Sequence, residues 1–198
     1  AMCYTSGTTG HPKGVVYGHR SSYLHSMAVC SGNGLGLSFS DKALPIVPMF
    51  HANAWGLPYA ALMAGADLVL PDRHMDATSM VDLIETQRPT VAGAVPTIWN
   101  DVMNHLDRNP GHDISSLRMV SCGGSAVPVS LMKAFEEKFG VQIRQLWGMD
   151  DFRAQLLVVP RQPHLEIEFG RAEIDRQRLT DDAWRRHVRR PVERKGPR

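Results

Sequence analysis

The residues best suited to chemistry lie in one short stretch near the beginning of the sequence, residues 4–14. The stretch holds three glycines, three threonines, one serine and one lysine. Glycine permits tight turns and close approach of the backbone to a ligand, and successive backbone N–H groups in such a turn can converge on an anion. Lys13 adds a positive charge suited to phosphate. This composition predicts a loop that binds the phosphates of a nucleotide.

The loop differs from the P-loop of NTPases. That motif requires a lysine that opens a helix and is followed by serine or threonine, whereas Lys13 lies between Pro12 and Gly14. We therefore expect Lys13 to lie in a loop, and an unrelated P-loop NTPase is disfavoured. The simplest alternative is a flexible Ser/Gly/Thr linker that binds nothing.

The composition sets limits on the class of protein. The 198 residues are 43% hydrophobic and 21% charged, which predicts a soluble globular domain with a sizeable core. Cys3, Cys30 and Cys122 have no metal-ligand spacing, so we expect reduced, buried thiols in a cytoplasmic protein. Residues 43–66 carry no formal charge, but three prolines interrupt them, which favours a buried strand and helix over a transmembrane segment.

The net charge is distributed unevenly. Residues 1–150 carry 10 basic and 12 acidic side chains, hence −2, and residues 151–198 carry 12 basic and 8 acidic, hence +4. A basic tail can contact nucleic acid, but no interleaved aromatic residues or nucleic-acid-binding motif accompany this one. We expect no nucleic-acid partner.

The rest of the chain alternates short apolar runs with segments of helical periodicity, which predicts an α/β fold with a mostly parallel sheet flanked by helices. Ligands of such folds bind at the carboxyl ends of the strands. The distinctive loops follow predicted strands, so we expect one shared site. The predicted strands are 15–17, 43–48, 67–70, 91–95, 117–121 and 141–146, with an apolar run at 156–159 and a further strand at 165–169; the predicted helices are 19–31, 57–63, 77–87 after an N-cap at Asp76, 96–106 and 130–139.

Residues 4–14 resemble the signature loop of the adenylate-forming (ANL) superfamily, which includes acyl-CoA synthetases, nonribosomal adenylation domains and luciferases. In that family the loop holds the β- and γ-phosphates of ATP while a carboxylate attacks the α-phosphorus. The resemblance implies that the ATP phosphates are bound by Thr5, Ser6, Gly7, Thr8, Thr9, Gly10 and Lys13.

Residues 49–56 resemble the second signature of the family, an aromatic-His turn beside the acyl substrate. The resemblance implies that His51 lies near the substrate carboxylate and Trp55 against the acyl tunnel. Residues 53–58 are most similar to medium- and long-chain fatty acyl-CoA synthetases. The alternative is a capping histidine and a core indole with no contact to substrate.

Residues 122–128 and 145–149 resemble two further stretches of the family. The first could equally be an ordinary strand-to-helix connection with Ser125 or Ser130 as helix cap. The resemblance implies that the adenine side of the nucleotide is framed by Gly123, Gly124, Ser125, Trp147, Gly148 and Met149.

The sequence departs from the family after Met149. The family continues with Thr-Glu, whose glutamate helps to hold Mg²⁺, whereas this chain has Asp150 and Asp151. Asp151 is the candidate metal ligand, with a side chain one methylene shorter. The family's ribose-binding aspartate and its lid domain with a catalytic lysine find no match in the arginine-rich tail. We expect residues 1–149 to be a partial AMP-binding domain and residues 150–198 an atypical tail introduced by a frameshift or rearrangement.

The resemblance implies a fatty acyl-CoA ligase that uses ATP, Mg²⁺ and CoA to convert a fatty acid to acyl-AMP and then acyl-CoA. It implies small-molecule substrates, no transmembrane segment, and a fold that allows a homodimer. The alternative is a truncated, catalytically inactive remnant that at most binds nucleotide or acyl chain. The sequence does not define the fatty-acid chain length.

Overall fold

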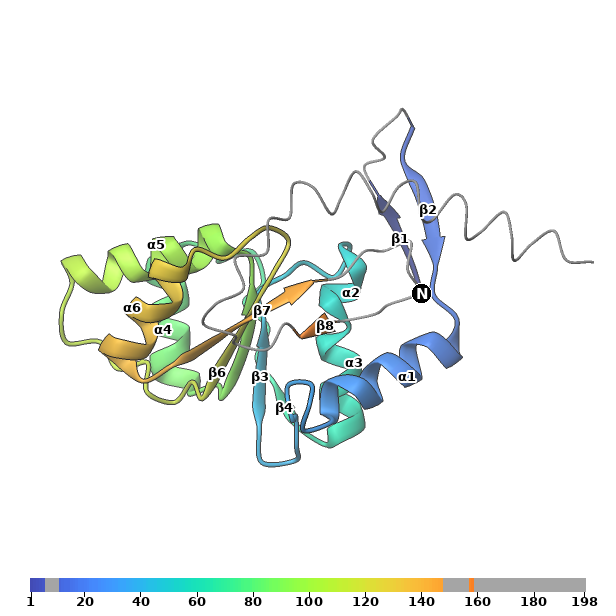
Figure 1. The fold of residues 1–198 in the computed structure, drawn as a ribbon, viewed down its shortest axis with the longest axis horizontal. Helices are drawn as coiled ribbons and strands as arrows, with labels where there is room; N and C mark the ends of the chain where they lie inside the picture. The colour runs from blue at the N-terminus through green and yellow to red at the C-terminus, as the bar shows by residue number, and fades with distance from the viewer. Residues whose placement is uncertain (6–10, 148–156, 159–198) are drawn as a thin grey trace, which may run out of the picture. The chain divides into compact units, whose positions relative to one another are not determined.

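The computed structural model describes residues 1–5, 11–147 and 157–158 (Figure 1), all within one compact unit, Ala1–Arg161. A six-stranded sheet has the strand order β4-β3-β5-β6-β7-β8. All neighbouring strands are parallel except the β7–β8 pair, which is antiparallel. The strands are β3 (Lys42–Pro45), β4 (Asp67–Leu68), β5 (Val91–Ala94), β6 (Met119–Cys122), β7 (Gln142–Trp147) and β8 (Leu157–Val158).

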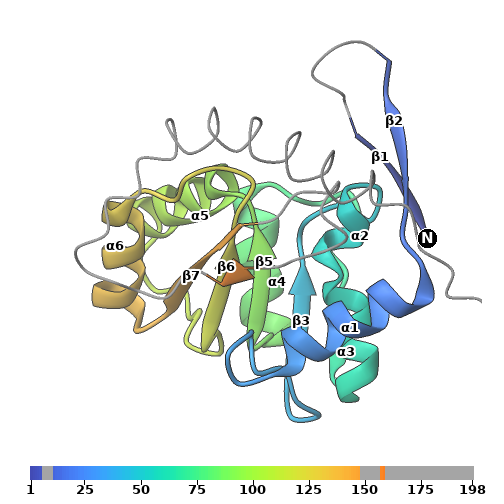
Figure 2. The ribbon, with the colours of Figure 1, turned by 45° about the vertical axis from the view of Figure 1, so that its right-hand side comes forward.

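Helices cover both faces of this sheet (Figure 2). One face packs against α4, α5 and α6, and the other against α1 and α3. Alternate strand residues point to opposite faces, so Leu44 and Val120 join the first layer while Ala43 and Met119 join the second. The α/β prediction is confirmed. The helices are α1 (His19–Cys30), α2 (Ala52–Trp55), α3 (Leu57–Ala64), α4 (Ala77–Gln87), α5 (Pro96–Arg108) and α6 (Val129–Phe139).

Local capping explains several helix boundaries. The Asp76 carboxylate accepts a hydrogen bond from the Ser79 N–H at 3.0 Å and caps α4 as predicted. For α6 the prediction was wrong: the N-cap is Pro128, and neither Ser125 nor Ser130 caps the helix. Among the described residues, no helix has the length and hydropathy that crossing a membrane requires.

A separate antiparallel hairpin precedes the sheet, formed by β1 (Met2–Thr5) and β2 (Lys13–Val16). Lys13 pairs with Thr5, so the prediction that Lys13 lies in a loop was wrong. Pro12 has no backbone N–H to donate to a ladder, whereas Lys13 has one. The strand therefore begins directly after Pro12.

The amino ends of three parallel strands are held together by one charge network. The Asp41 carboxylate, 6% exposed, accepts hydrogen bonds from Arg118 at 2.8 Å, Thr90 at 2.7 Å and the Ser38 N–H at 2.9 Å. Burial alone would favour the neutral acid, but these hydrogen bonds hold the pKa of Asp41 well below its usual range. Asp41, Thr90 and Arg118 each directly precede a strand, so the network fixes the strands relative to one another.

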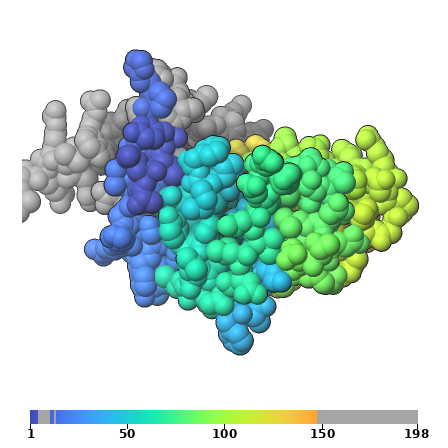
Figure 3. Space-filling view, turned by 180° about the vertical axis from the view of Figure 1, so that it is seen from behind, coloured from blue at the N-terminus to red at the C-terminus, as the bar shows by residue number. Residues whose placement is uncertain are grey.

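The three cysteines are free thiols. Cys3 and Cys122 are buried, as predicted, whereas Cys30 is half-buried. Burial raises the pKa of the Cys122 thiol to about 12, which keeps it protonated and unreactive. On the surface seen from behind, the α2–α3 and α4–α5 segments form adjoining parts, and the segment that precedes β3 protrudes (Figure 3).

Candidate functional site

The turn after β3 has an unusual backbone. Ala52, Asn53, Ala54 and Trp55 have φ values of 45°, 52°, 52° and 55°, all in the left-handed region. Gly56 follows with φ 68°. This conformation costs about 1–2 kcal/mol for each L-residue other than glycine, so neighbouring structure must hold the turn in place. Strain of this kind concentrates at ligand-binding sites.

His25 of α1 is the residue that holds the turn. Its Nε2 lies 2.9 Å from the Trp55 carbonyl oxygen; because a carbonyl can only accept, Nε2 carries the proton and donates. In the neutral ring Nδ1 is then an acceptor, and it is buried without a hydrogen-bond partner in the described part of the chain. A Cβ at Gly56 would lie 2.4 Å from the His25 ring, so only glycine fits beneath the imidazole. Sequence analysis did not single out His25.

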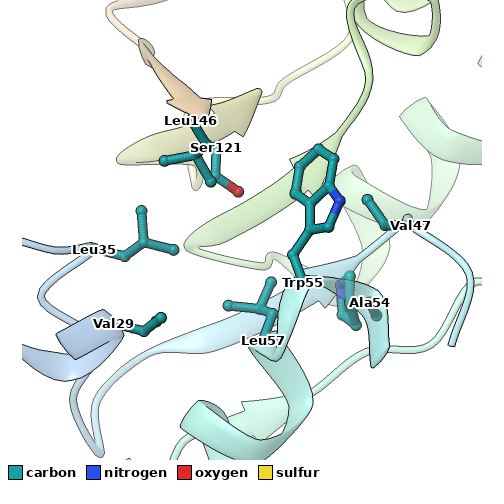
Figure 4. A pocket seen from close by; sticks show the side chains of 10 residues that line it. Val29, Leu35, Val47, Ala54, Trp55, Leu57, Ser121 and Leu146 are labelled. Carbon is teal, nitrogen blue, oxygen red and sulfur yellow. The ribbon is translucent and has the colours of Figure 1, made fainter. Parts of the chain in front are cut away.

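An apolar pocket opens beside this turn (Figure 4). The indole of Trp55 stands in the middle of the lining, with Leu35 on one side and Val47 on the other. The one hydroxyl in the lining, that of Ser121, already donates to the Ala92 carbonyl at 3.1 Å. The pocket is lined by Val29, Leu35, Pro45, Val47, Ala54, Trp55, Leu57, Gly93, Ser121 and Leu146.

The place of this pocket follows from the strand order. The chain passes from β3 to β4 on one side and then to β5 on the other side of β3. The connections after β3 and β5 therefore leave toward opposite faces, and open α/β sheets bind ligands at such a switch point. Pro45 ends β3 and Gly93 lies in β5, and both line the pocket.

Gly93 leaves room for the Ser121 hydroxyl. A Cβ at this position would lie 2.8 Å from Ser121 Oγ, whereas Leu57 Cδ2 at 3.5 Å and Trp55 Cε3 at 3.9 Å would be in ordinary van der Waals contact. A larger residue at 93 would therefore push against Ser121.

Comparison with known proteins identifies the family. The profile described as AMP-binding enzyme matches residues 1–167, which is most of the chain. The chain belongs to the AMP-binding enzyme family. The resemblance to adenylate-forming enzymes is confirmed.

Curated relatives of this family member are CoA ligases. A 3-methylmercaptopropionyl-CoA ligase from Ruegeria lacuscaerulensis is 46% identical over 151 residues, which cover 76% of this chain and 28% of that ligase. A long-chain-fatty-acid–CoA ligase from Thermus thermophilus is 47% identical over 150 residues, covering 76% and 27%. A medium-chain-fatty-acid–CoA ligase from Ectopseudomonas oleovorans is 46% identical with 76% and 28% coverage. The chain thus spans between 27% and 28% of the length of these relatives.

Solved structures agree with this assignment. The inhibitor-bound N-terminal domain of FACL13 from Mycobacterium tuberculosis has a TM-score of 0.69 at 31% identity, covering 79% of this chain and 39% of that domain. A long-chain-fatty-acid-CoA ligase from Archaeoglobus fulgidus has a TM-score of 0.70 at 28% identity, covering 81% and 33%. o-Succinylbenzoate CoA synthetase from Bacillus subtilis, in complex with ATP and magnesium, has a TM-score of 0.66 at 27% identity, covering 79% and 32%.

Several family positions fall in the described part of the chain. His51 is exposed and occupies the N-cap position of α2, but its side chain makes no capping bond, so the alternative of a capping histidine holds for its position and not for its imidazole. Trp55 is half-buried and lines the pocket. Gly124 has φ 84°, and a Cβ at Gly123 would meet the Leu146 carbonyl at 2.8 Å. The fold therefore requires glycine at both positions, independently of any contact with a ligand.

The remaining family positions lie at the borders of the described residues or outside them. Thr5 and Lys13 form the last pair of the hairpin ladder, so their backbones flank residues 6–10 of the sequence. Ser125 is exposed after β6, and Trp147 is the last residue of β7. Outside the described residues lie Ser6, Gly7, Thr8, Thr9, Gly10, Gly148, Met149 and Asp151.

Proposed function

We propose that this chain is the nucleotide- and acyl-binding part of a fatty acyl-CoA ligase. The observation that carries the proposal is the apolar pocket at the β3–β5 switch point, with Trp55 in its lining, in a member of the AMP-binding family. The lining is apolar, which suits an acyl chain, although the free space between the side chains, about 10 Å³, is too small to hold one in this structure. The names of the medium- and long-chain ligases among the relatives support this substrate class.

The proposed reaction has two steps. A carboxylate oxygen of the fatty acid attacks the α-phosphorus of ATP, the bond to the bridging oxygen breaks, and pyrophosphate leaves with the electron pair. The thiolate of CoA then attacks the acyl carbonyl carbon, and AMP leaves. The chain's own groups would bind and orient these substrates: the hydroxyls and amides of the 5–10 loop and Lys13 offset charge that develops on pyrophosphate.

The remaining residues have proposed roles around the same centre. His51, exposed next to the turn, would orient the substrate carboxylate. The 123–125 turn and residues 147–149 would frame adenine. Asp151 is the residue we propose for Mg²⁺, which would neutralise phosphate charge.

A second candidate function is binding without turnover. It is favoured by the pair Asp150–Asp151, where the family has Thr-Glu, because Asp150 puts a negative charge at a position that contacts phosphate in the family. We also propose that residues 150–198 form a divergent tail on the 1–149 domain, and that the protein is cytoplasmic and able to form a homodimer. Reading the coding DNA past Met149 in the other frames tests the origin of the tail.

The test combines nucleotide binding with turnover. We expect Lys13→Ala to weaken ATP binding about tenfold or more, because a hydrogen bond from a charged group contributes about 1.5–3 kcal/mol. AMP binding should change less, since AMP lacks the outer phosphates. Isothermal titration of the full chain with both nucleotides measures this, and Lys133→Ala, exposed on α6, is the matched control.

Equal losses for ATP and AMP would show that Lys13 does not contact the outer phosphates. Steady formation of fatty acyl-CoA from octanoate or palmitate, abolished by Lys13→Ala, would support the ligase over the binding protein. ATP binding without thioester formation would support the second candidate.

A further inference from the structure

A second group of polar side chains lies on the other side of the sheet from the pocket, where α4 meets the segment between α5 and β6. Asp82 and Glu85 are one turn apart on α4, so they share a helix face. His112 comes from the segment after α5. One donor atom from each of the three side chains lies within 4.8 Å of the other two. α4 forms part of the surface seen in Figure 3.

The backbone holds two of these side chains in place. Glu85 Oε2 lies 2.8 Å from His112 Nδ1, and Glu85 Oε1 accepts the Asp113 N–H at 2.7 Å. Asp113 is in turn bound to Arg88 at 2.8 Å. The Glu85 carboxylate is therefore held by two hydrogen bonds from the segment between α5 and β6.

Asp82 differs from its neighbours. Among the described residues, no donor or cation pairs with its carboxylate, although it lies beside an already satisfied Glu85–His112 pair. Among the described residues of this group, the carboxylates of Asp82, Glu85 and Asp113 are accompanied by one permanent cation in an ion pair, Arg88. The cluster thus has both a spare oxygen donor and excess negative charge.

A second imidazole stands next to the cluster. The ring centroids of His105 and His112 are 5.6 Å apart with an interplanar angle of 44°. His105 Nδ1 lies 3.4 Å from Thr78 Oγ1 and 3.5 Å from Asn109 Nδ2, both of which can donate to it. In the neutral ring, an Nδ1 that accepts these hydrogen bonds places the ring proton on Nε2, so His105 lies beside the cluster without a free nitrogen lone pair for a metal.

We propose that Asp82, Glu85 and His112 bind a divalent transition-metal ion of the Zn²⁺ type. Mg²⁺ and Ca²⁺ prefer all-oxygen sites, whereas a mixed set of carboxylates and imidazole suits Zn²⁺ and its neighbours. Three protein donors leave a fourth position to water. The ion would replace the Glu85–His112 hydrogen bond by two bonds to metal and cross-link α4 to the segment before β6. This site is separate from the acyl pocket and does not depend on the proposed ligase reaction.

The experiment is a titration of the full chain with Zn²⁺, followed by long-range ¹H–¹⁵N spectra of the histidine rings. We expect the ring nitrogens of His112 to shift on binding, with a smaller shift at His105. Asp82→Asn removes one ligand without touching the Glu85–His112 hydrogen bond, so it should weaken Zn²⁺ binding tenfold or more. His112→Gln should weaken it further. His74→Gln, an exposed histidine in the turn before α4, is the control and should leave affinity unchanged.

Thermal unfolding provides the second measurement. The melting temperature should rise with Zn²⁺ in the wild type and not in Asp82→Asn, while the two proteins melt alike in chelator, which shows that the variant is folded. Excess Mg²⁺ should not displace Zn²⁺. Equal Zn²⁺ affinity in the wild type and Asp82→Asn, or shifts confined to histidines other than 105 and 112, would overturn the proposal.

Discussion

At the amino ends of β3, β5 and β6 every polar group of the Asp41 network is paired, whereas the carboxyl ends carry a strained turn, a buried unpaired nitrogen and an apolar pocket. Both ends belong to the same strands. The amino end therefore contributes stability, and the carboxyl end stores strain where ligands of α/β folds bind. Substitutions at the two ends should separate these roles.

The largest expected effect is at the carboxyl end, in Gly56→Ala. The new Cβ would lie 2.4 Å from His25 at a backbone φ of 68°, so left-handed strain and overpacking together should lower the free energy of unfolding by about 3 kcal/mol. Urea unfolding measures this. Gly32→Ala, where a Cβ meets nothing within 4 Å, should be nearly neutral.

A double-mutant cycle sharpens this prediction. His25→Ala removes the ring that the Cβ meets, so adding it to Gly56→Ala should recover part of the loss. Strict additivity of the two substitutions would mean that the imidazole does not press on the turn.

The next effect is at the amino end, in Asp41→Asn. Losing charged hydrogen bonds at a buried carboxylate should lower the free energy of unfolding by about 1.5–3 kcal/mol, with no change in ligand binding at the pocket. Asp107→Asn breaks only a half-exposed pair with Lys138 and should cost less than about 1 kcal/mol. Similar losses in the two variants would contradict the special role of the network.

The same network has a pH signature. Since the folded pKa of Asp41 lies below the unfolded value of about 3.9, its stabilisation is fully present above that value and is lost as the pH falls from it toward the folded pKa. The difference in the free energy of unfolding between the wild type and Asp41→Asn should therefore decrease as the pH falls below about 4. Unfolding curves between neutral and acidic pH measure the difference, and an advantage that persists in acid would contradict it.

The smallest effect is within the pocket, in Ser121→Ala. Removing its hydrogen bond to Ala92 should lower the free energy of unfolding by about 1 kcal/mol. Because Ser121 Oγ is the atom nearest to a Cβ at position 93, Ser121→Ala should make Gly93→Ala better tolerated. If Gly93→Ala is equally destabilised with serine or alanine at 121, the loss comes from contacts with Leu57 or Trp55 and not with Ser121.

Patterns local in sequence predicted the elements well. The helix of 19–31 ends one residue earlier at Cys30, and Asp76 caps α4, because periodicity and capping are properties of neighbouring residues. The family motifs located the turn at His51 and Trp55 because they are short and contiguous. The family itself was recognisable for the same reason.

Contacts distant in sequence were not predictable. His25 meets Trp55 across 30 residues, and nothing near position 25 signals it. The left-handed backbone of residues 52–55 arises from packing around an alanine-rich segment that has no intrinsic preference for it. Lys13 was expected in a loop because proline and glycine flank it, but pairing with Thr5 extends the hairpin to that residue.

The strand order also has consequences for how the chain folds. Ala43 pairs with Val91 and the Arg118 guanidinium reaches Asp41 across 77 residues, so no pair within the parallel sheet can form by simple hairpin closure. Contacts of such long sequence separation slow folding. The charge network joins residues that precede three different strands, so we expect it to form after the transition state. A contact that forms this late acts on the unfolding rate, so Asp41 and Arg118 should slow the opening of the assembled sheet and do little to speed its formation.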